Sequence, residues 1–152
     1  TLRDGAKADD DFLALLDYED FRVTLAAGTL VADPTPRFRV HGTQGSFVKY
    51  GLDPQEDRLK AGEVPTPQWG IDSQPGILTL REGEGENAPL TRSEYPTLPG
   101  DYLAYYQGIA AAIRDKAPLP VSVDDALRSM ALLEAGLDSH RQRRWITLKN
   151  HH

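Results

Sequence analysis

The sequence predicts an α+β domain: a largely antiparallel, open sheet with helices packed on one face. Three observations predict this fold class. Segments that alternate apolar and polar residues with the two-residue period of strands occupy the first two thirds of the chain. Two segments with the longer period of amphipathic helices follow them. The resulting order, strands and then two helices and a last short strand, is the order of an α+β layout.

Length and composition limit the possible functions. The chain has 152 residues, which suits one domain with a sizeable core, so we expect a single domain over residues 1–152. A formal net charge of -6 predicts an acidic surface that repels phosphate backbones, and nucleic acid is not an expected partner. The absence of cysteine excludes a disulfide scaffold and a thiolate nucleophile. No apolar run approaches the about 20 residues of a membrane-spanning helix, so no membrane partner is expected.

The first two strands are predicted before residue 33. The short apolar run Phe12–Tyr18 suits either a strand or a short helix. We favour a strand, because a second strand-like run, Phe21–Ala32, follows it after a tight acidic turn. Large apolar and small side chains alternate along that second run, which leaves one face open to close packing.

The next strands form hairpins. Residues Arg37–Tyr50 alternate on both sides of a glycine-containing turn at Gly42–Gly45, and this pattern predicts a hairpin. Residues Ile77–Arg81 and Leu90–Tyr95 are predicted to be partner strands joined by an acidic turn.

A proline-rich segment, residues 51–76, separates these two hairpins. Asp53 as a cap and Pro54 at the first position predict a short helix there. The remainder is expected to be a long loop, and loops of this length are typically functional or disordered. Trp69 lies in this loop, and an exposed tryptophan would suggest docking onto another molecule.

Two helices are predicted near the C-terminal end. The first begins at Asp101 and ends at Ala117–Pro120, and its tyrosines are expected to lie mostly in the core. The second begins at Ser122, where Asp125 three residues later completes a capping-box pattern. Residues Trp145–Leu148 are predicted to form the last short strand. The expected buried stripe of the second helix consists of Val123, Leu127, Met130, Leu133 and Leu137.

No motif in the sequence assembles a reaction. The segment Gly83–Ala88 lacks the third glycine of a dinucleotide fingerprint and its glutamates would repel a pyrophosphate, so we interpret it as a turn. The segment Gly42–Ser46 lacks the lysine of a phosphate-binding loop and is also interpreted as a turn. Neither His41 nor His140 has a second ligand at metal spacing, so no metal site is expected.

Charged clusters have structural explanations as well as functional ones. The carboxylates Asp53, Glu56 and Asp57 suit a solvated first helical turn, and the alternative is hydrogen bonding to a polyol or a partner chain. Three arginines between residues 141 and 144 suit helix capping, with anion binding as the alternative.

The string Arg37–Leu59, which reads RFRVHGTQGSFVKYGLDPQEDRL, resembles the C-terminal domain of Gfo/Idh/MocA oxidoreductases, in particular the subgroup of scyllo-inositol dehydrogenase-like proteins. Weaker similarity extends over nearly the whole chain. The resemblance implies an NAD(P)-dependent parent enzyme that acts on a sugar or cyclitol hydroxyl in the cytoplasm. It also implies an upstream Rossmann domain that carries the cofactor and the catalytic residues, and that is absent from this chain.

On this resemblance, the chain supplies one wall of the substrate cleft for a small polyol and binds no NAD(P) by itself. The free face of its sheet is expected to form a homo-oligomer. No catalytic or cofactor-binding residue is assigned, and the candidates for substrate or interface contacts are Lys49, Tyr50, Asp53, Trp69 and Asp72, chosen because they flank or lie in the long loop.

Two alternatives remain open. The chain could be a stand-alone α+β binding or dimerisation module without enzymatic activity. A weaker alternative is a small enzyme that uses His41 with an acid. The terminal residues His151 and His152 are assigned no function.

Overall fold

The computed structural model describes residues 4–5, 7–33, 35–66 and 68–148. Its internal contacts define two compact units, which we describe separately. Unit 1 comprises residues 1–32 and 108–152, and unit 2 comprises residues 33–107. The α+β class is confirmed, because the described residues combine helices with antiparallel sheets that are open. His151 and His152 lie outside the described residues.

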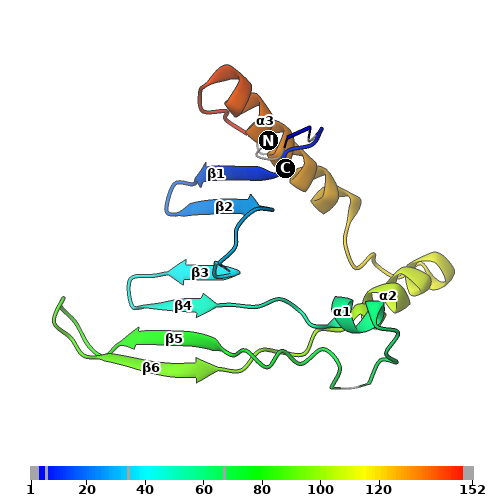
Figure 1. Cartoon of the computed structure of the whole chain (residues 1–152), viewed down its shortest axis with the longest axis horizontal. Helices are drawn as coiled ribbons and strands as arrows, with labels where there is room; N and C mark the ends of the chain where they lie inside the picture. Colours follow the sequence, from blue (N-terminus) through cyan, green and yellow to red (C-terminus); the bar gives the residue numbers. More distant parts are fainter. Residues whose placement is uncertain (1–3, 6, 34, 67, 149–152) are drawn as a thin grey trace. The chain divides into compact units, whose positions relative to one another are not determined.

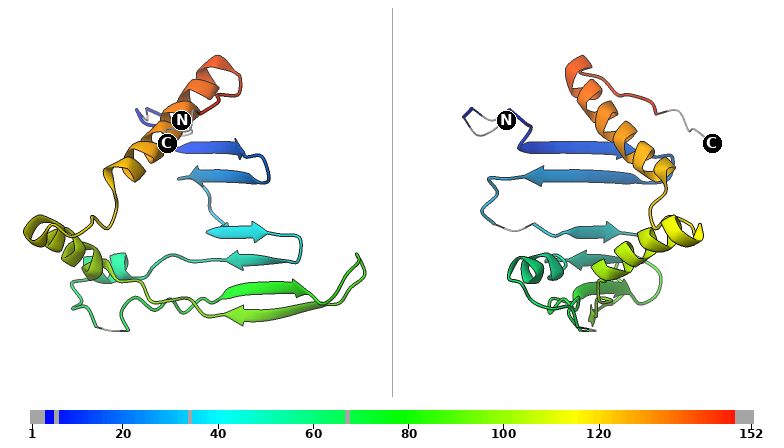
Figure 2. Two further views of the ribbon diagram at one scale, coloured as in Figure 1. Left: turned by 180° about the vertical axis from the view of Figure 1, so that it is seen from behind. Right: turned by 90° about the vertical axis from the view of Figure 1, so that its right-hand side faces the viewer.

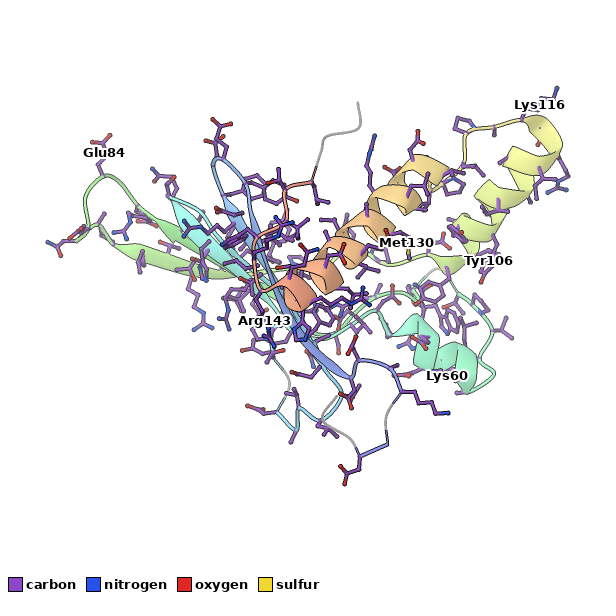
Figure 3. The ribbon with its side chains drawn as sticks, turned by 90° about the horizontal axis from the view of Figure 1, so that it is seen from above. Lys60, Glu84, Tyr106, Lys116, Met130 and Arg143 are labelled. Carbon is purple, nitrogen blue, oxygen red and sulfur yellow. The ribbon has the colours of Figure 1, made fainter. Side chains whose placement is uncertain are left out.

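Unit 2 is built on a four-stranded antiparallel sheet with the strand order β3-β4-β5-β6 (Figure 1). The hairpin predicted for Arg37–Tyr50 is confirmed as β3 and β4, which pair from Phe38 opposite Lys49 to His41 opposite Ser46. The turn between β5 and β6 carries Glu84 at its tip (Figure 3). The strands are β3 (Phe38–His41), β4 (Gly45–Lys49), β5 (Gly76–Arg81) and β6 (Leu90–Tyr95).

Phe47 anchors the middle of this sheet. Its ring contacts Tyr95 edge to face, with 6.3 Å between the ring centroids. Gly76 pairs with Tyr95 across β5 and β6, and it is buried beneath the Phe47 ring. A side chain at residue 76 would occupy the space that this ring fills.

Replacing Gly76 with alanine is therefore expected to cost about 1–3 kcal/mol, because the new methyl group overpacks against Phe47. Urea unfolding measures this loss. The matched control is Gly136→Ala in a helix of unit 1, where nothing lies within 4 Å of the added atom. That control is expected to stabilise its helix by up to about 1 kcal/mol. Equal effects of the two changes would contradict the packing argument.

Two helices belong wholly or partly to unit 2. Helix α1 (Gln55–Lys60) follows β4 after a short connection, and helix α2 (Tyr102–Asp115) begins in unit 2 and continues into unit 1. The prediction for α1 was one residue too early, because Pro54 is the cap and the helix begins at Gln55. The Asp53 carboxylate instead accepts a hydrogen bond from the Gln55 backbone N–H at 2.8 Å.

Unit 1 contains a two-stranded antiparallel hairpin and helix α3 (Val123–Gln142). Strand β1 (Asp11–Asp17) confirms the first predicted strand, whereas β2 (Arg22–Gly28) ends four residues before the predicted boundary at Ala32. The chain turns at residues 29–30, where the Thr29 N–H bonds the carbonyl of Asp10 at 2.9 Å. The predicted single sheet is thus two sheets, β1-β2 and β3-β4-β5-β6.

The predicted capping box of α3 is confirmed. The Asp125 N–H donates to the Ser122 hydroxyl at 3.1 Å, and that hydroxyl donates to the Asp125 carboxylate at 2.6 Å. The hydroxyl holds the pKa of the Asp125 carboxyl below its usual value. At the other end, Arg143 adopts a left-handed conformation with φ of 55°, and the Ser139 hydroxyl bonds the carbonyl of Arg144 at 2.7 Å.

Two expectations for the C-terminal part are wrong. Residues Trp145–Leu148 form no strand, because the chain leaves α3 through this left-handed turn and finds no pairing partner among the described strands. The apolar stripe of α3 is not buried, since none of the residues of α2 or α3 is buried. Met130 on α3 and Tyr106 on α2 (Figure 3) are 54% and 66% exposed. The periodicity was correct, but no side chains in the described part of the chain bury the two stripes.

Candidate functional site

A cavity of about 250 Å³ lies in unit 2, where the chain leaves β4 and where it returns toward β5. Its volume is just below the roughly 300–1,000 Å³ of pockets for drug-sized ligands, so it suits a small molecule. Four of the lining residues are carboxylates, which gives the cavity an acidic character. The lining residues are Gly51, Leu52, Asp53, Pro54, Glu56, Asp57, Asp72 and Gln74.

Lys49 and Asp72 form an ion pair at one wall of this cavity. The Lys49 ammonium at the end of β4 donates to the Asp72 carboxylate and to the carbonyl of Tyr50. The two side chains are only 8% and 15% exposed. The other oxygen of Asp72 accepts the Gln74 N–H at 2.9 Å. The pair therefore fastens the returning loop to β4, although the two residues are 23 positions apart in the sequence.

The hydrogen bond from Lys49, supported by the Gln74 N–H, holds the pKa of the Asp72 carboxyl below its usual value, while burial opposes the shift. The unfolded chain then binds more protons than the folded one near the ordinary pKa of about 3.9. The stabilising contribution of Asp72 is accordingly complete above this pH and is lost as the pH falls through the lowered pKa.

We expect Asp72→Asn to flatten the dependence of stability on pH between about pH 5 and pH 2. Urea midpoints measured over this range for both proteins give the comparison. The difference between the two proteins should be largest above about pH 4 and should shrink as the pH falls. A difference that stays constant over the range would contradict the assignment.

Gly51 shapes the same wall. Its φ of +77° lies in the region that favours glycine, and a side chain there would meet the Gln74 amide oxygen and the Asp72 carboxylate. Glycine at residue 51 therefore allows the backbone to pass directly beside the ion pair.

Asp53 lies at the start of α1 and is held by one neighbour. The side-chain amide of Gln55 donates to both Asp53 carboxylate oxygens at 2.9 Å. The amide oxygen of Gln55 accepts the N–H of Tyr102 at the start of α2, at 3.1 Å. Gln55 is 3% exposed, so it links two helix starts from a buried position. Both views in Figure 2 show α1 next to the start of α2.

A close backbone crossing makes this link possible. The N–H of Gly100 bonds the carbonyl of Gly70 at 3.0 Å. A side chain at Gly100 would overlap the Asp53 carboxylate and the Gln55 amide. Three segments far apart in the sequence thus meet at one point beside the cavity.

The five sequence candidates have different positions in unit 2. Asp53 and Asp72 line the cavity. Lys49 does not line it but contacts Asp72. Tyr50 contributes its carbonyl, while its side chain is 47% exposed. Trp69 is not part of the cavity lining.

The expectation that Trp69 is exposed for docking is wrong. Trp69 is 5% exposed and is the buried large hydrophobic residue among those that the structure describes in unit 2. Its indole N–H donates to Glu63 at 3.1 Å, and its carbonyl accepts from Arg58 at 2.8 Å. The long loop therefore folds back onto α1 and supplies its own core.

The cavity can accept hydrogen bonds from hydroxyl groups. Ionised carboxylates are acceptors only, and they repel anions. The Lys60 ammonium at the end of α1 is paired with Glu56 at 2.8 Å. An uncharged ligand with several hydroxyl groups fits this chemistry best.

The turn that carries the incomplete glycine pattern does not suit a dinucleotide. The turn at Gly83–Ala88 joins two strands, so it offers no helix N-terminus to a pyrophosphate. Among the residues that the structure describes, no group of three or more histidine, aspartate or glutamate side chains could hold a metal ion. No helix in the described part of the chain is long and apolar enough to cross a membrane. His41 is exposed and shares a hydrogen bond of 2.8 Å with Ser46.

Sequence reasoning missed Gln55, Gly51 and Gly100. A glutamine beside a proline-capped helix start gave a weak signal, because its buried position depends on a contact with Tyr102, 47 positions further along. The glycines were visible, but the residues that approach them were not.

Comparison with known families identifies the chain. The profile described as "Oxidoreductase family, C-terminal alpha/beta domain", of the Gfo/Idh/MocA type, matches residues 1–148. The chain therefore belongs to the Gfo/Idh/MocA oxidoreductase family and corresponds to its C-terminal domain. The resemblance noted for the central string is confirmed.

Individual relatives of the chain are also named as oxidoreductases. The chain is 43% identical over 148 residues to the uncharacterized oxidoreductase YdgJ of Escherichia coli, covering 97% of this chain and 42% of YdgJ. It is 36% identical over 151 residues to scyllo-inositol 2-dehydrogenase (NADP(+)) IolW of Bacillus subtilis, covering 97% of this chain and 41% of that enzyme. The chain thus spans less than half the length of these relatives.

Solved structures show the same fold. A putative oxidoreductase from Yersinia pestis superposes with a TM-score of 0.85 at 47% identity, covering 99% of this chain and 43% of that one. The putative oxidoreductase yvaA from Bacillus subtilis gives a TM-score of 0.89 at 36% identity, covering 98% and 44%.

Proposed function

We propose that this chain is the C-terminal, substrate-facing domain of an NAD(P)-dependent oxidoreductase that acts on a sugar or cyclitol hydroxyl. The observation that carries the proposal is the family match over residues 1–148, together with the relationship to an enzyme named as a scyllo-inositol 2-dehydrogenase using NADP(+). The cavity lined by Asp53 and Asp72 adds support, because its carboxylates suit a polyol.

Substrate binding and hydride transfer belong to different parts of the proposed enzyme. This chain's own residues bind and orient the hydroxyl groups, and Lys49 holds Asp72 in place for this task. The bound cofactor, held by a Rossmann domain elsewhere in the parent polypeptide, accepts or supplies the hydride. The chain alone is expected to be inactive. A cytoplasmic location is part of the proposal, since the nicotinamide cofactor of such an enzyme is supplied inside the cell.

Self-association through the sheet is also proposed. The cross-strand pairing places Phe38, Val40, Leu80 and Tyr95 on one face of the four-stranded sheet, and these side chains are 46–60% exposed. Apolar faces of this kind are covered in stable proteins, and a second subunit would provide the cover. Light scattering should show dimers or larger species, and a strictly monomeric particle at high concentration would count against the interface.

The catalytic part of the proposal is tested on the product of the complete coding sequence. That protein is expected to contain a glycine-rich βαβ unit before residue 1 and to reduce NAD⁺ or NADP⁺ in the presence of myo- or scyllo-inositol or a related polyol. Asp53→Asn should raise KM for the polyol. An open reading frame without such a unit would favour a stand-alone binding module instead.

A further inference from the structure

We propose that Gln55 is a positioning residue, whose buried amide fixes the Asp53 carboxylate at the cavity and ties it to the first turn of helix α2. The residue lines no part of the cavity itself. It acts through Asp53, which does.

The two ends of the Gln55 amide have separate partners. Its NH₂ group donates to both oxygens of Asp53, and its oxygen accepts the N–H of Tyr102. These partners fix the orientation of the amide, because a carboxylate can only accept and a backbone N–H can only donate. The amide is thus a connector with one donating and one accepting end.

Neither half of this connector is redundant. The N–H of Tyr102 is one of the first N–H groups of α2, which have no partner inside the helix. Asp101 satisfies the N–H of Ala104 at 3.0 Å, and Gln55 satisfies that of Tyr102. At the donating end, all the hydrogen bonds found for the Asp53 carboxylate among the described residues come from the amide and backbone of Gln55.

The surroundings leave the connector little freedom. Gln55 is 3% exposed, and the Gly100 backbone lies so close that an added Cβ would stand 2.6 Å from its amide nitrogen. Movement of the Asp53 carboxylate is therefore transmitted to the start of α2. Glutamine is the residue that meets these demands: asparagine is one methylene shorter, and glutamate would oppose Asp53 with a second negative charge.

Hydrogen exchange at the Tyr102 amide tests the accepting end in the full 152-residue chain. Gln55→Met keeps the length of the side chain and removes both polar ends, so exchange should accelerate about tenfold, as expected for one lost hydrogen bond. Gln55→Glu keeps an accepting oxygen and should leave exchange within about threefold of the wild type. Gln107→Met, on the exposed surface of α2, is the matched control and should change nothing.

A reciprocal exchange tests the donating end. Gln55→Glu alone places a second carboxylate beside that of Asp53. The repulsion between the two should lower the urea midpoint of unit 2. Adding Asp53→Asn restores one donor and one acceptor in the opposite order, and it should recover most of the lost midpoint. A residue that only fills space would show no such rescue. Fluorescence of Trp69 in a Trp145→Phe background reports on unit 2, since these are the two tryptophans of the chain.

A third arm rests on the proposed function. In the intact enzyme, Gln55→Glu should raise KM for the polyol about tenfold with a smaller effect on kcat. If the intact protein oxidises no polyol, the proposed function fails, and the exchange and rescue measurements still decide the role of Gln55. That role is overturned if the Tyr102 amide exchanges at the same rate in Gln55→Met and Gln107→Met. It is also overturned if adding Asp53→Asn to Gln55→Glu does not restore the urea midpoint.

Discussion

Replacing Lys49 with methionine is expected to destabilise unit 2 by about 3 kcal/mol, because the Asp72 carboxylate is left without its cation in a largely buried position. Removal of one partner of a fully buried pair typically costs about 3–5 kcal/mol. The lower end applies here because the Asp72 side chain retains 15% exposure. Urea unfolding followed through Trp69 fluorescence in the Trp145→Phe background measures the loss.

The matched control for this change is Lys60→Met. Lys60 is 2.8 Å from Glu56, a distance typical of an ion pair, yet the two side chains are 68% and 53% exposed. Water screens such a pair, so the control should cost no more than about 0.5 kcal/mol. A double variant, Lys49→Met with Asp72→Asn, should recover part of the stability by removing the stranded charge. Equal losses from Lys49→Met and Lys60→Met would show that burial does not strengthen the dependence on the cation.

Replacing Trp69 with alanine is expected to cost about 3–5 kcal/mol. The residue is 5% exposed and forms the centre of the loop that follows α1, so its removal leaves a cavity and removes the hydrogen bond to the Glu63 carboxylate. Thermal and urea unfolding followed by circular dichroism measure the loss. Trp69→Phe should cost less, because the ring volume is largely kept while the hydrogen bond to Glu63 is lost.

Trp145→Ala is the control for the loss of a tryptophan as such. Trp145 is 63% exposed in unit 1, and its replacement should change stability by no more than about 0.5 kcal/mol. If the two tryptophan variants unfold at the same urea concentration, the long loop is not held by Trp69 and the position of the cavity wall needs another explanation.

Local patterns predicted the local parts of the fold. Alternation around a glycine-containing turn predicted the β3-β4 hairpin, and the spacing of Ser122 and Asp125 predicted the start of α3. These features depend on residues close together in the sequence. The end of β2 was placed too late, because apolar residues continue past Gly28 although the pairing stops there.

Burial could not be predicted in the same way. The stripes of α2 and α3 have the correct period but are exposed, whereas Trp69 in a proline-rich loop is buried. Periodicity shows which side chains share a face, and it does not show what covers that face. The site was predicted in part for the same reason: Lys49, Asp53 and Asp72 were chosen for flanking the loop, while the contact that joins Gln55 to Tyr102 spans 47 positions.

We propose that these residues shape a substrate cleft while the cofactor is held by another part of the parent enzyme. Calorimetric titration of the 152-residue chain with NADPH tests this division between the two parts of the enzyme. We expect no saturable heat, because the turn at Gly83–Ala88 joins two strands, so it offers a pyrophosphate no helix start, and its glutamates would repel the pyrophosphate. Saturable binding with micromolar affinity would contradict the claim, since the cofactor site would then lie within this chain.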